Sequence, residues 1–369
     1  MTTIRSLTSR LQRVPLTRPW AADVTSVGVI ATHVVRSDGA EGWGFSWSPQ
    51  IGASAVHALL DHDIATAAVG RSATPVECWQ GMWEHLHEAG GGGITTIALA
   101  GLDLALWDAE ARSSGLSVSE SIGRRRERVR TYGSGVNLHY SLDDLLAQVQ
   151  RWIDAGFEAV KIKVGKPDIA EDVDRVGAVR ELLGPDRGLM IDANQRWDLA
   201  RATASVEALS RFDLAWIEEP LRADDLDGHT ELARRIDVPI ALGENLHTAH
   251  RFGDFLRAGA AQIVQPNIVR VGGITPFLRI AEVAAEHGVA LHPHLLPELS
   301  GQLALSLPDT AAEMLVEDVE DAGFGALGAL ADPSPVTVAD GWLTENAHDG
   351  LGLRFSPVLS ADASSRDQA

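Results

Sequence analysis

Apolar and polar positions follow two successive patterns along this chain, and the change falls near Arg128. In the first part, turn residues at 37–39 favour a hairpin between two of three segments with strand character, which are Ile4–Val14, Gly28–Arg36 and Gly42–Trp47. Two helical segments follow, His57–Ala68 and Thr96–Ser113, and the second carries a wide apolar face. This pattern predicts an α+β domain.

From about Arg128, short apolar runs alternate with amphipathic helical stretches. The predicted strands begin near Val129, Ala159, Leu189, Leu214, Ile240, Ile263, Ala290 and Met314. The predicted helices cover residues 142–155, 170–183, 199–210, 228–235, 249–258, 275–287 and 302–307. Seven or eight βα units without a Gly-rich dinucleotide fingerprint favour a (β/α)-barrel, a modified TIM barrel, over an open doubly wound sheet.

These patterns divide the 369 residues into three parts. Residues 1–125 form the α+β domain, and residues 126–330 form the barrel domain, which is expected to carry the metal and catalytic residues. Residues 331–369 look irregular and are expected to return to the first domain, with the polar tail Ser360–Ala369 fraying. A barrel needs about 250 residues, so the length fits a barrel with a smaller second domain.

Composition narrows the range of partners. Hydrophobic residues make up 45% of the chain and charged residues 22%, as in a globular protein with a full core. The formal net charge of −20 argues against nucleic acid, whose phosphates require clustered Lys and Arg. Cys78 is the single cysteine, so no internal disulfide can form, and no apolar run approaches the length of a membrane span. We expect a cytoplasmic protein that binds neither nucleic acid nor membrane.

Three equally spaced carboxylates are the most informative feature of the barrel region. Asp192, Glu218 and Glu244 are 26 residues apart in each case, and each follows a short apolar run. A strand with its returning helix takes about 25 residues, so this spacing puts one acid at the same end of three successive βα units. Three acids aimed at one point repel one another unless a cation lies between them, and all-oxygen ligands favour Mg²⁺. The sequence therefore predicts a magnesium site.

Candidate acids and bases surround this predicted site. Lys161 and Lys163 lie two apart on the preceding strand and would face the same side, where each lowers the pKa of the other and prepares a lysine to act as a base. His294 closes a later strand and is a candidate acid or base. His292 either shares the face of His294 or packs as a structural residue.

Other polar residues have alternatives that the sequence leaves open. Asn194 could support the metal ligands or contact a bound oxygen, and Glu219 could support the ligands or pair with a lysine. Glu317, at the end of the last predicted strand, could reach the site as an acid or hydrogen-bond partner, or be structural. The run Gly90–Gly93 lacks the Lys-Ser/Thr of a P-loop, which favours a flexible connection.

A metal with a base on one side and an acid or base on the other suggests one reaction class. The substrate would be a small-molecule carboxylate whose oxygens bind the metal. The metal and a cation would stabilise the enediolate that forms when a proton leaves the carbon next to that carboxylate. Lysine and histidine would flank this carbon on opposite faces.

Five segments closely resemble the mandelate racemase subgroup of the enolase superfamily: Lys161–Gly165, Met190–Asn194, Trp216–Pro220, Gly243–Asn245 and Val271–Ile274. The resemblance covers nearly the whole chain and implies that the α+β domain is a capping domain completed by the C-terminal segment. Within the subgroup the chain is similar to galactarate/talarate dehydratases at Lys161–Gly165, Ala170–Asp172 and Gln265-Pro266. It is also similar to 3,6-anhydro-galactonate cycloisomerases at Gly243–Thr248.

The resemblance implies a role for each candidate residue. Lys163 would be one general base, Lys161 would assist at the substrate carboxylate, and His294 would be the opposite acid or base. The Mg²⁺ ligands would be Asp192, Glu218 and Glu244. Loops at residues 18–26 and 46–54 of the capping domain would close over the substrate, and Trp197 and Arg196 on a barrel loop are similarly placed. The candidate substrate contacts are Arg18, Trp20, Trp47, Asn194, Arg196, Asn267 and Glu317.

Asn267 departs from the family pattern, in which an Asp after Gln-Pro hydrogen-bonds the catalytic histidine. An Asp raises the pKa of a histidine, whereas Asn orients the ring without adding charge. His294 should therefore be a weaker base than its counterparts, or find another partner such as Glu317. A weaker His294 base should impair two-base racemisation more than dehydration, because in dehydration Lys163 takes the proton and His294 only protonates a departing hydroxide.

The leading interpretation is a Mg²⁺-dependent dehydratase of a polyhydroxy (sugar) acid, a carbon–oxygen lyase. An isomerase of the same site comes second, either a lactone cycloisomerase or a racemase or epimerase. A non-catalytic binding protein that retains the metal site comes third. Relatives form dimers or octamers, so a homo-oligomer is expected.

Overall fold

The computed structural model describes residues 1–21 and 23–356, so the predicted fraying of Ser360–Ala369 lies outside it. The chain begins with a three-stranded antiparallel sheet in the order β1-β2-β3. Its strands are β1 (Ile4–Pro15), β2 (Ser26–Arg36) and β3 (Glu41–Ser48). All three predicted strands and the hairpin between β2 and β3 are thereby confirmed.

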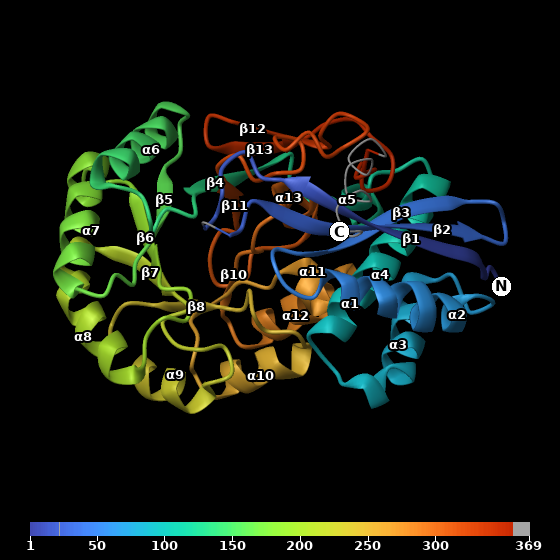
Figure 1. Ribbon diagram of the computed structural model, residues 1–369, viewed down its shortest axis with the longest axis horizontal. Helices are drawn as coiled ribbons and strands as arrows, with labels where there is room; N and C mark the ends of the chain where they lie inside the picture. The colour runs from blue at the N-terminus through green and yellow to red at the C-terminus, as the bar shows by residue number, and fades with distance from the viewer. Residues whose placement is uncertain (22, 357–369) are drawn as a thin grey trace, which may run out of the picture.

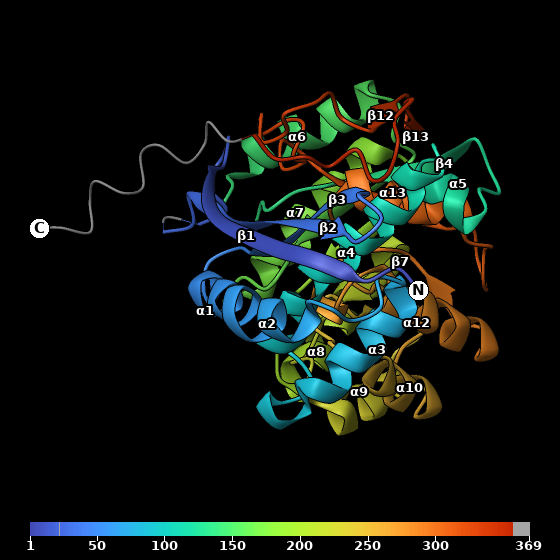
Figure 2. The same cartoon turned by 90° about the vertical axis from the view of Figure 1, so that its right-hand side faces the viewer.

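The helices of this capping domain pack on the sheet and on one another (Figure 2). They are α1 (Ala53–Ala58), the π-helical η1 (Leu59–Ile64), α2 (Ala65–Ala68), α3 (Pro75–His85), the 3-10 turn η2 (His87–Ala89), α4 (Ile94–Ser113) and α5 (Val118–Ile122). The helix α4 approaches β3 so closely that a Cβ on Gly42 would lie 2.0 Å from the carbonyl oxygen of Ala105. Only glycine permits this contact.

A barrel of eight parallel strands follows within the described residues, as predicted (Figure 1). The strands are β4 (Arg128–Ser134), β5 (Ala159–Lys163), β6 (Gly188–Asp192), β7 (Leu214–Glu218), β8 (Ile240–Leu242), β9 (Ile263–Val264), β10 (Ala290–Leu291) and β11 (Leu315–Val319). The helices are α6 (Leu142–Asp154), α7 (Ile169–Leu183), α8 (Leu199–Leu209) with η3 (Ser210–Phe212), α9 (Leu226–Ala233), α10 (Ala249–Arg257), α11 (Ile268–Val271), α12 (Ile274–Glu286) and α13 (Pro297–Ser306). Figure 1 shows α6 to α10 along the outer rim of the barrel.

His292 occupies the gap between β10 and β11, which no backbone pairing joins within the described part of the chain. Its Nδ1 accepts a hydrogen bond of 3.1 Å from the backbone nitrogen of Leu315. Its ring stacks on Trp216 with centroids 5.3 Å apart, and burial lowers the pKa of His292 to about 4. His292 therefore packs as a structural residue, which is one of the two alternatives that the sequence left open.

The segment after Ala331 was expected to be irregular, and this expectation is wrong. A hairpin of β12 (Val336–Ala339) and β13 (Trp342–Glu345) extends the barrel sheet, with β13 antiparallel to β4. The dipeptide at 340–341 is Asp-Gly with positive φ at both residues, a hairpin turn signal that the sequence contained. Beyond the hairpin, the backbone nitrogen of Leu351 donates to Asp108 of α4, so the chain contacts both domains.

The barrel interior below the carboxyl ends of the strands is apolar. It is filled by Tyr132, Met190, Trp216, Ala241, Ile263 and Ala290. Among the described residues, no helix combines the length and the hydropathy that a membrane span requires.

Candidate active site

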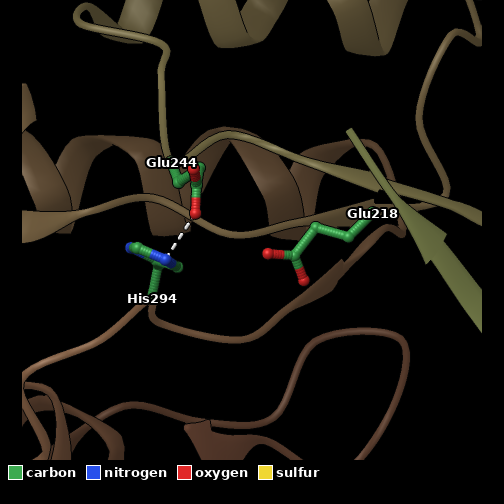
Figure 3. A group of neighbouring side chains, drawn as sticks. All are labelled: Glu218, Glu244 and His294. Atoms are coloured by element: carbon green, nitrogen blue, oxygen red, sulfur yellow. Dashed lines mark ion pairs between the residues drawn. The ribbon is translucent and has the colours of Figure 1, made fainter. Parts of the chain in front are cut away.

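The ends of neighbouring barrel strands place the three predicted metal ligands at one rim of the barrel. Asp192 and Glu218 end β6 and β7 and lie opposite each other in the parallel register. Glu244 follows Gly243, whose φ is 140° and whose added Cβ would lie 2.9 Å from the backbone nitrogen of Gln265. Glycine alone allows this turn to direct Glu244 toward the axis. Figure 3 shows Glu218 and Glu244 extending toward a region that His294 reaches from the other side.

Lys161 and Lys163 extend from alternate positions of β5 into this cluster. Nζ of Lys161 lies 2.7 Å from Oε1 of Glu218 and 2.7 Å from Oε1 of Glu317. Nζ of Lys163 pairs with the carboxylate of Asp192. The structure therefore brings both lysines together with the carboxylates, and Glu317 belongs to the same cluster.

The expectation that the paired lysines have lowered pKa values is wrong. Burial and Lys161 both lower the pKa of Lys163, but Asp192 and the other nearby carboxylates together outweigh them and the pKa is raised. Burial also lowers the pKa of Lys161, and Glu218 and Glu317 raise it well above its usual value. Opposite charges at contact distance decide the direction, because they lie closer than the like charge.

His294 lies between two carboxylates and an amide. Its Nε2 is 2.5 Å from Oε2 of Glu244 and 3.5 Å from Oε2 of Glu317, while its Nδ1 is 3.1 Å from Nδ2 of Asn267. Burial lowers the pKa of His294, but the two carboxylates outweigh burial and raise it. Burial raises the pKa of Glu317, but Lys161 and His294 lower it to about 2, so Glu317 is an anion in this cluster.

Glu219 turns away from the lysines, because its φ of 40° breaks the alternation of β7. Both of its carboxylate oxygens accept from Nδ2 of Asn245 at 2.9 Å, and Nε2 of Gln195 lies 3.2 Å away. Asn245 also donates to Oε1 of Glu244 at 3.0 Å and accepts from Arg270 at 2.6 Å. Glu219 therefore supports the proposed ligand Glu244 through Asn245, and it does not pair with a lysine.

The cluster has a charge balance that suits a divalent cation. Five carboxylates, Asp192, Glu218, Glu219, Glu244 and Glu317, lie near only two lysines. Burial and the neighbouring Asp192 raise the pKa of Glu218 to about 7 even though Lys161 opposes them. One ligand atom each from Glu218, Glu244 and His294 lie within 4.8 Å of one another. The carboxylates among these donors suit Mg²⁺, and Asp192, which pairs with Lys163, supplies a further carboxylate at the same rim.

Asn194 and Arg196 follow β6 at the rim of this cluster. The backbone nitrogen of Asn194 donates to Oδ1 of Asp192 at 2.7 Å and its Nδ2 to Oδ2 at 3.3 Å, so Asn194 orients that carboxylate. Arg196 is exposed, and its side chain covers Gly165, where a Cβ would lie 2.7 Å from Cδ of Arg196. Trp197 is buried, and its Nε1 has no hydrogen-bond partner among the described residues.

Two of the predicted capping-domain contacts, Arg18 and Trp20, lie beside the ends of β4 and β11, and Trp47 lies in β3. Arg18 lies 3.6 Å from Glu320 and 3.7 Å from Asp321, so its charge is already paired. Trp20 and Trp47 form an edge-to-face pair with centroids 6.3 Å apart, and Trp47 is buried. The structure does not bring these three side chains into contact with the carboxylate cluster.

Sequence reasoning missed three amides that hold the cluster. Oδ1 of Asn137 accepts from the backbone nitrogen of Lys163 at 2.9 Å. Nε2 of Gln265 donates to Oε2 of Glu218 at 2.7 Å, and Asn245 bridges Glu219 and Glu244. Gln265 and Asn245 lie within segments whose resemblance was noted. The available signal was that Gln265 directly follows β9 and that Asn245 comes next to Glu244 after β8.

Comparisons with known families match almost the whole chain. Residues 5–123 match the N-terminal domain of the mandelate racemase / muconate lactonizing enzyme family, and residues 144–358 match the enolase C-terminal domain-like family. The 3,6-anhydro-α-L-galactonate cycloisomerase of Streptomyces coelicolor is 36% identical over 326 residues, which are 88% of this chain and 88% of that protein. The L-talarate/galactarate dehydratase of Salmonella typhimurium is 38% identical over 292 residues, covering 77% of this chain and 72% of that protein.

A solved structure extends the likeness to three dimensions. The L-talarate dehydratase from Polaromonas sp. JS666, crystallised with Mg and L-glucarate, superimposes with a TM-score of 0.87 at 35% identity. The match covers 97% of this chain and 96% of that one.

Proposed function

Because the chain belongs to the mandelate racemase / muconate lactonizing enzyme family, with an enolase-like C-terminal domain, we propose that it is a magnesium-dependent dehydratase of a polyhydroxy acid. One observation carries this proposal. Lys163 and His294 reach the same carboxylate cluster from different strands, Lys163 at Asp192 and His294 at Glu244. A substrate carboxylate held there would have an amine on one side and an imidazole on the other.

Asp192, Glu218 and Glu244 would hold Mg²⁺, in agreement with the excess of carboxylates over lysines. When bound, the ion would stabilise the negative charge that develops on the substrate carboxylate as the α proton leaves. The anion that raises the pKa of Lys163 would then be neutralised, and the amine would be available as a base.

Side chains of the protein carry out proton abstraction, binding of the substrate carboxylate and departure of the hydroxyl. Nζ of Lys163 takes the α proton, and Nζ of Lys161, which Glu317 holds in place, contacts the substrate carboxylate. Nε2 of His294 faces the β-hydroxyl and aids its departure, so that water is lost and a 2-keto acid results after tautomerisation. Asn194, Arg196 and Asn267 are proposed to contact the substrate or to orient the groups that do, with Arg196 available to a distal carboxylate or hydroxyl.

An isomerase of the same site is the second candidate, because a cycloisomerase is 36% identical to this chain over 88% of its length. Both reactions begin with α-proton abstraction by Lys163. They differ in mass balance, since dehydration releases water and isomerisation does not. The proposal also includes a cytoplasmic homo-oligomer acting on small acids, for which sedimentation of the purified protein would report the assembly.

The deciding experiment is incubation of the purified protein with Mg²⁺ and a library of mono- and diacid sugars in D₂O. Products are followed by NMR and by semicarbazide detection of 2-keto acids. A keto acid from one substrate supports dehydration, and deuterium at the α carbon without a keto acid moves the isomerase to first place. Lys163→Ala is the control, and equal behaviour of this variant and the wild type would favour a non-catalytic binding protein.

A further inference from the structure

The two ring nitrogens of His294 face partners of different kinds. Nε2 faces carboxylate oxygens of Glu244 at 2.5 Å and Glu317 at 3.5 Å, and both can only accept a hydrogen bond when ionised. Nδ1 faces the amide group of Asn267 at 3.1 Å. An amide can donate or accept, so the orientation of Asn267 decides what Nδ1 must do.

The backbone of α11 sets that orientation. Asn267 is the N-cap of α11, and its Oδ1 accepts from the backbone nitrogens of Val269 and Arg270, both at 3.1 Å. A flipped amide would put Nδ2 against these two N–H groups, so donors would face donors in a site where Asn267 is 1% exposed. The donor Nδ2 therefore points to His294.

We infer that Asn267 holds neutral His294 in the tautomer that carries its proton on Nε2. Nδ1 then accepts from Nδ2 of Asn267, and Nε2–H is directed at the carboxylate oxygens. The opposite tautomer would set two N–H groups against each other at Nδ1 and a lone pair against carboxylates at Nε2. Contacts at both ends of the ring favour the same form.

This inference deepens the proposed function and rests on it for its consequence. A ring with its proton on Nε2 has no lone pair there, so His294 does not remove a proton from the substrate. Complete transfer of that proton would leave a ring anion, so Nε2–H acts as a hydrogen-bond donor to the departing oxygen, as neutral histidines do elsewhere. The hydroxyl then leaves as hydroxide and the α proton stays on Lys163 until it is released to solvent, so that hydroxide and proton together account for the water that is lost.

Asn267→Asp offers a closely matched change. A carboxylate at 267 still caps α11, because one oxygen can accept from the nitrogens of Val269 and Arg270. Its other oxygen would face Nδ1 of His294 as an acceptor in place of a donor. The variant should therefore keep its helix cap while a proton is placed on Nδ1 of His294, because that nitrogen then faces an acceptor.

The test is ¹⁵N NMR of histidine-labelled protein with Mg²⁺ at about pH 9.5, well above the usual pKa of histidine, because Glu244 and Glu317 raise the pKa of His294. His294→Asn or His294→Gln, whichever retains the wild-type unfolding temperature, identifies the His294 resonances by their loss. We expect an unprotonated Nδ1 and a protonated Nε2 in the wild type, and a protonated Nδ1 in Asn267→Asp. A protonated Nδ1 in the wild type, whether as the other tautomer or as the cation, would overturn the inference. The spectrum reports the tautomer whether or not a substrate is found, so failure of the proposed function is a separate result.

Discussion

Asp103 of α4 in the capping domain accepts two hydrogen bonds from Thr275 at the start of α12 in the barrel. One comes from the backbone nitrogen at 3.0 Å and the other from the hydroxyl at 2.6 Å. The N-cap of α12 is Gly273, which has no side chain to satisfy these donors, and a Cβ there would lie 2.3 Å from Oδ2 of Asp103. A residue of one domain therefore caps a helix of the other.

Replacement of Asp103 by Ala should lower the free energy of unfolding by about 2 kcal/mol, because buried donors at the start of α12 lose their acceptor. Urea unfolding measures this loss. Thr275→Val is the matched variant, since it removes the hydroxyl but keeps the backbone contact, and it should cost about half as much. Equal stability of Asp103→Ala and wild type would show that this contact does not hold the domains together.

The same carboxyl should make stability depend on pH. Burial raises the pKa of Asp103 to about 7, and the hydrogen bonds from Thr275 only partly oppose this. In the unfolded chain an Asp titrates near its ordinary value, so between about pH 4 and 7 the folded state binds more protons at this residue and stability falls as pH rises. Asp103→Asn removes the titration. The stability of this variant relative to wild type should therefore increase from about pH 5 to pH 8, and a constant difference would contradict the assignment.

The two lysines should differ in their importance for folding. Lys161 is 1% exposed and pairs with both Glu218 and Glu317, so Lys161→Met leaves two buried carboxylates without their cation. We expect a loss of about 3–5 kcal/mol in metal-free protein. Lys163 has one carboxylate partner, and its side chain is 12% exposed, so Lys163→Met should cost less. Urea titrations in EDTA would compare them, and the reverse order would contradict this reading of the cluster.

Magnesium should stabilise the folded protein even without substrate. The cluster holds an excess of carboxylates, and a cation bound at about 100 times its dissociation constant contributes about 2.7 kcal/mol. The unfolding temperature should therefore rise when Mg²⁺ replaces EDTA. The rise should disappear in Glu218→Gln and remain in Glu127→Gln, whose side chain is 91% exposed. A rise of equal size in both variants would place the ion elsewhere.

Asn245 should strengthen the binding of Mg²⁺ without being a ligand of the ion. Its amide donates to Glu244 at 3.0 Å and to Glu219 at 2.9 Å, so it orients one proposed ligand. Removal of such a supporting contact typically weakens metal binding about 10–100-fold, and Asn245→Ala should fall in this range by calorimetric titration with Mg²⁺. Gln150→Ala, on the exposed face of α6, is the control and should bind as wild type does. Unchanged affinity in Asn245→Ala would contradict the supporting role.

The order of the elements could be predicted from the sequence because it is encoded locally. Each short apolar run of the barrel region became a strand. Asp192 and Glu218 end their strands, and Glu244 follows its strand after one intervening residue. Parallel strands of one barrel end at one rim, so equal spacing was enough to predict that these side chains would meet. The hairpin at residues 336–345 was missed, although its Asp-Gly turn was visible, because its strands are short and are stabilised by pairing with β4, far away in the sequence.

The electrostatics of the site depended on the tertiary structure. Two lysines adjacent on a strand repel each other, and only the folded positions of Asp192, Glu218 and Glu317 reverse the direction of their pKa shifts. The sequence determined which residue types reach the rim of the barrel. The fold alone decided their charge and the direction of their hydrogen bonds, such as the amide of Asn267 turned toward His294, because these depend on distances between atoms from strands far apart in the chain.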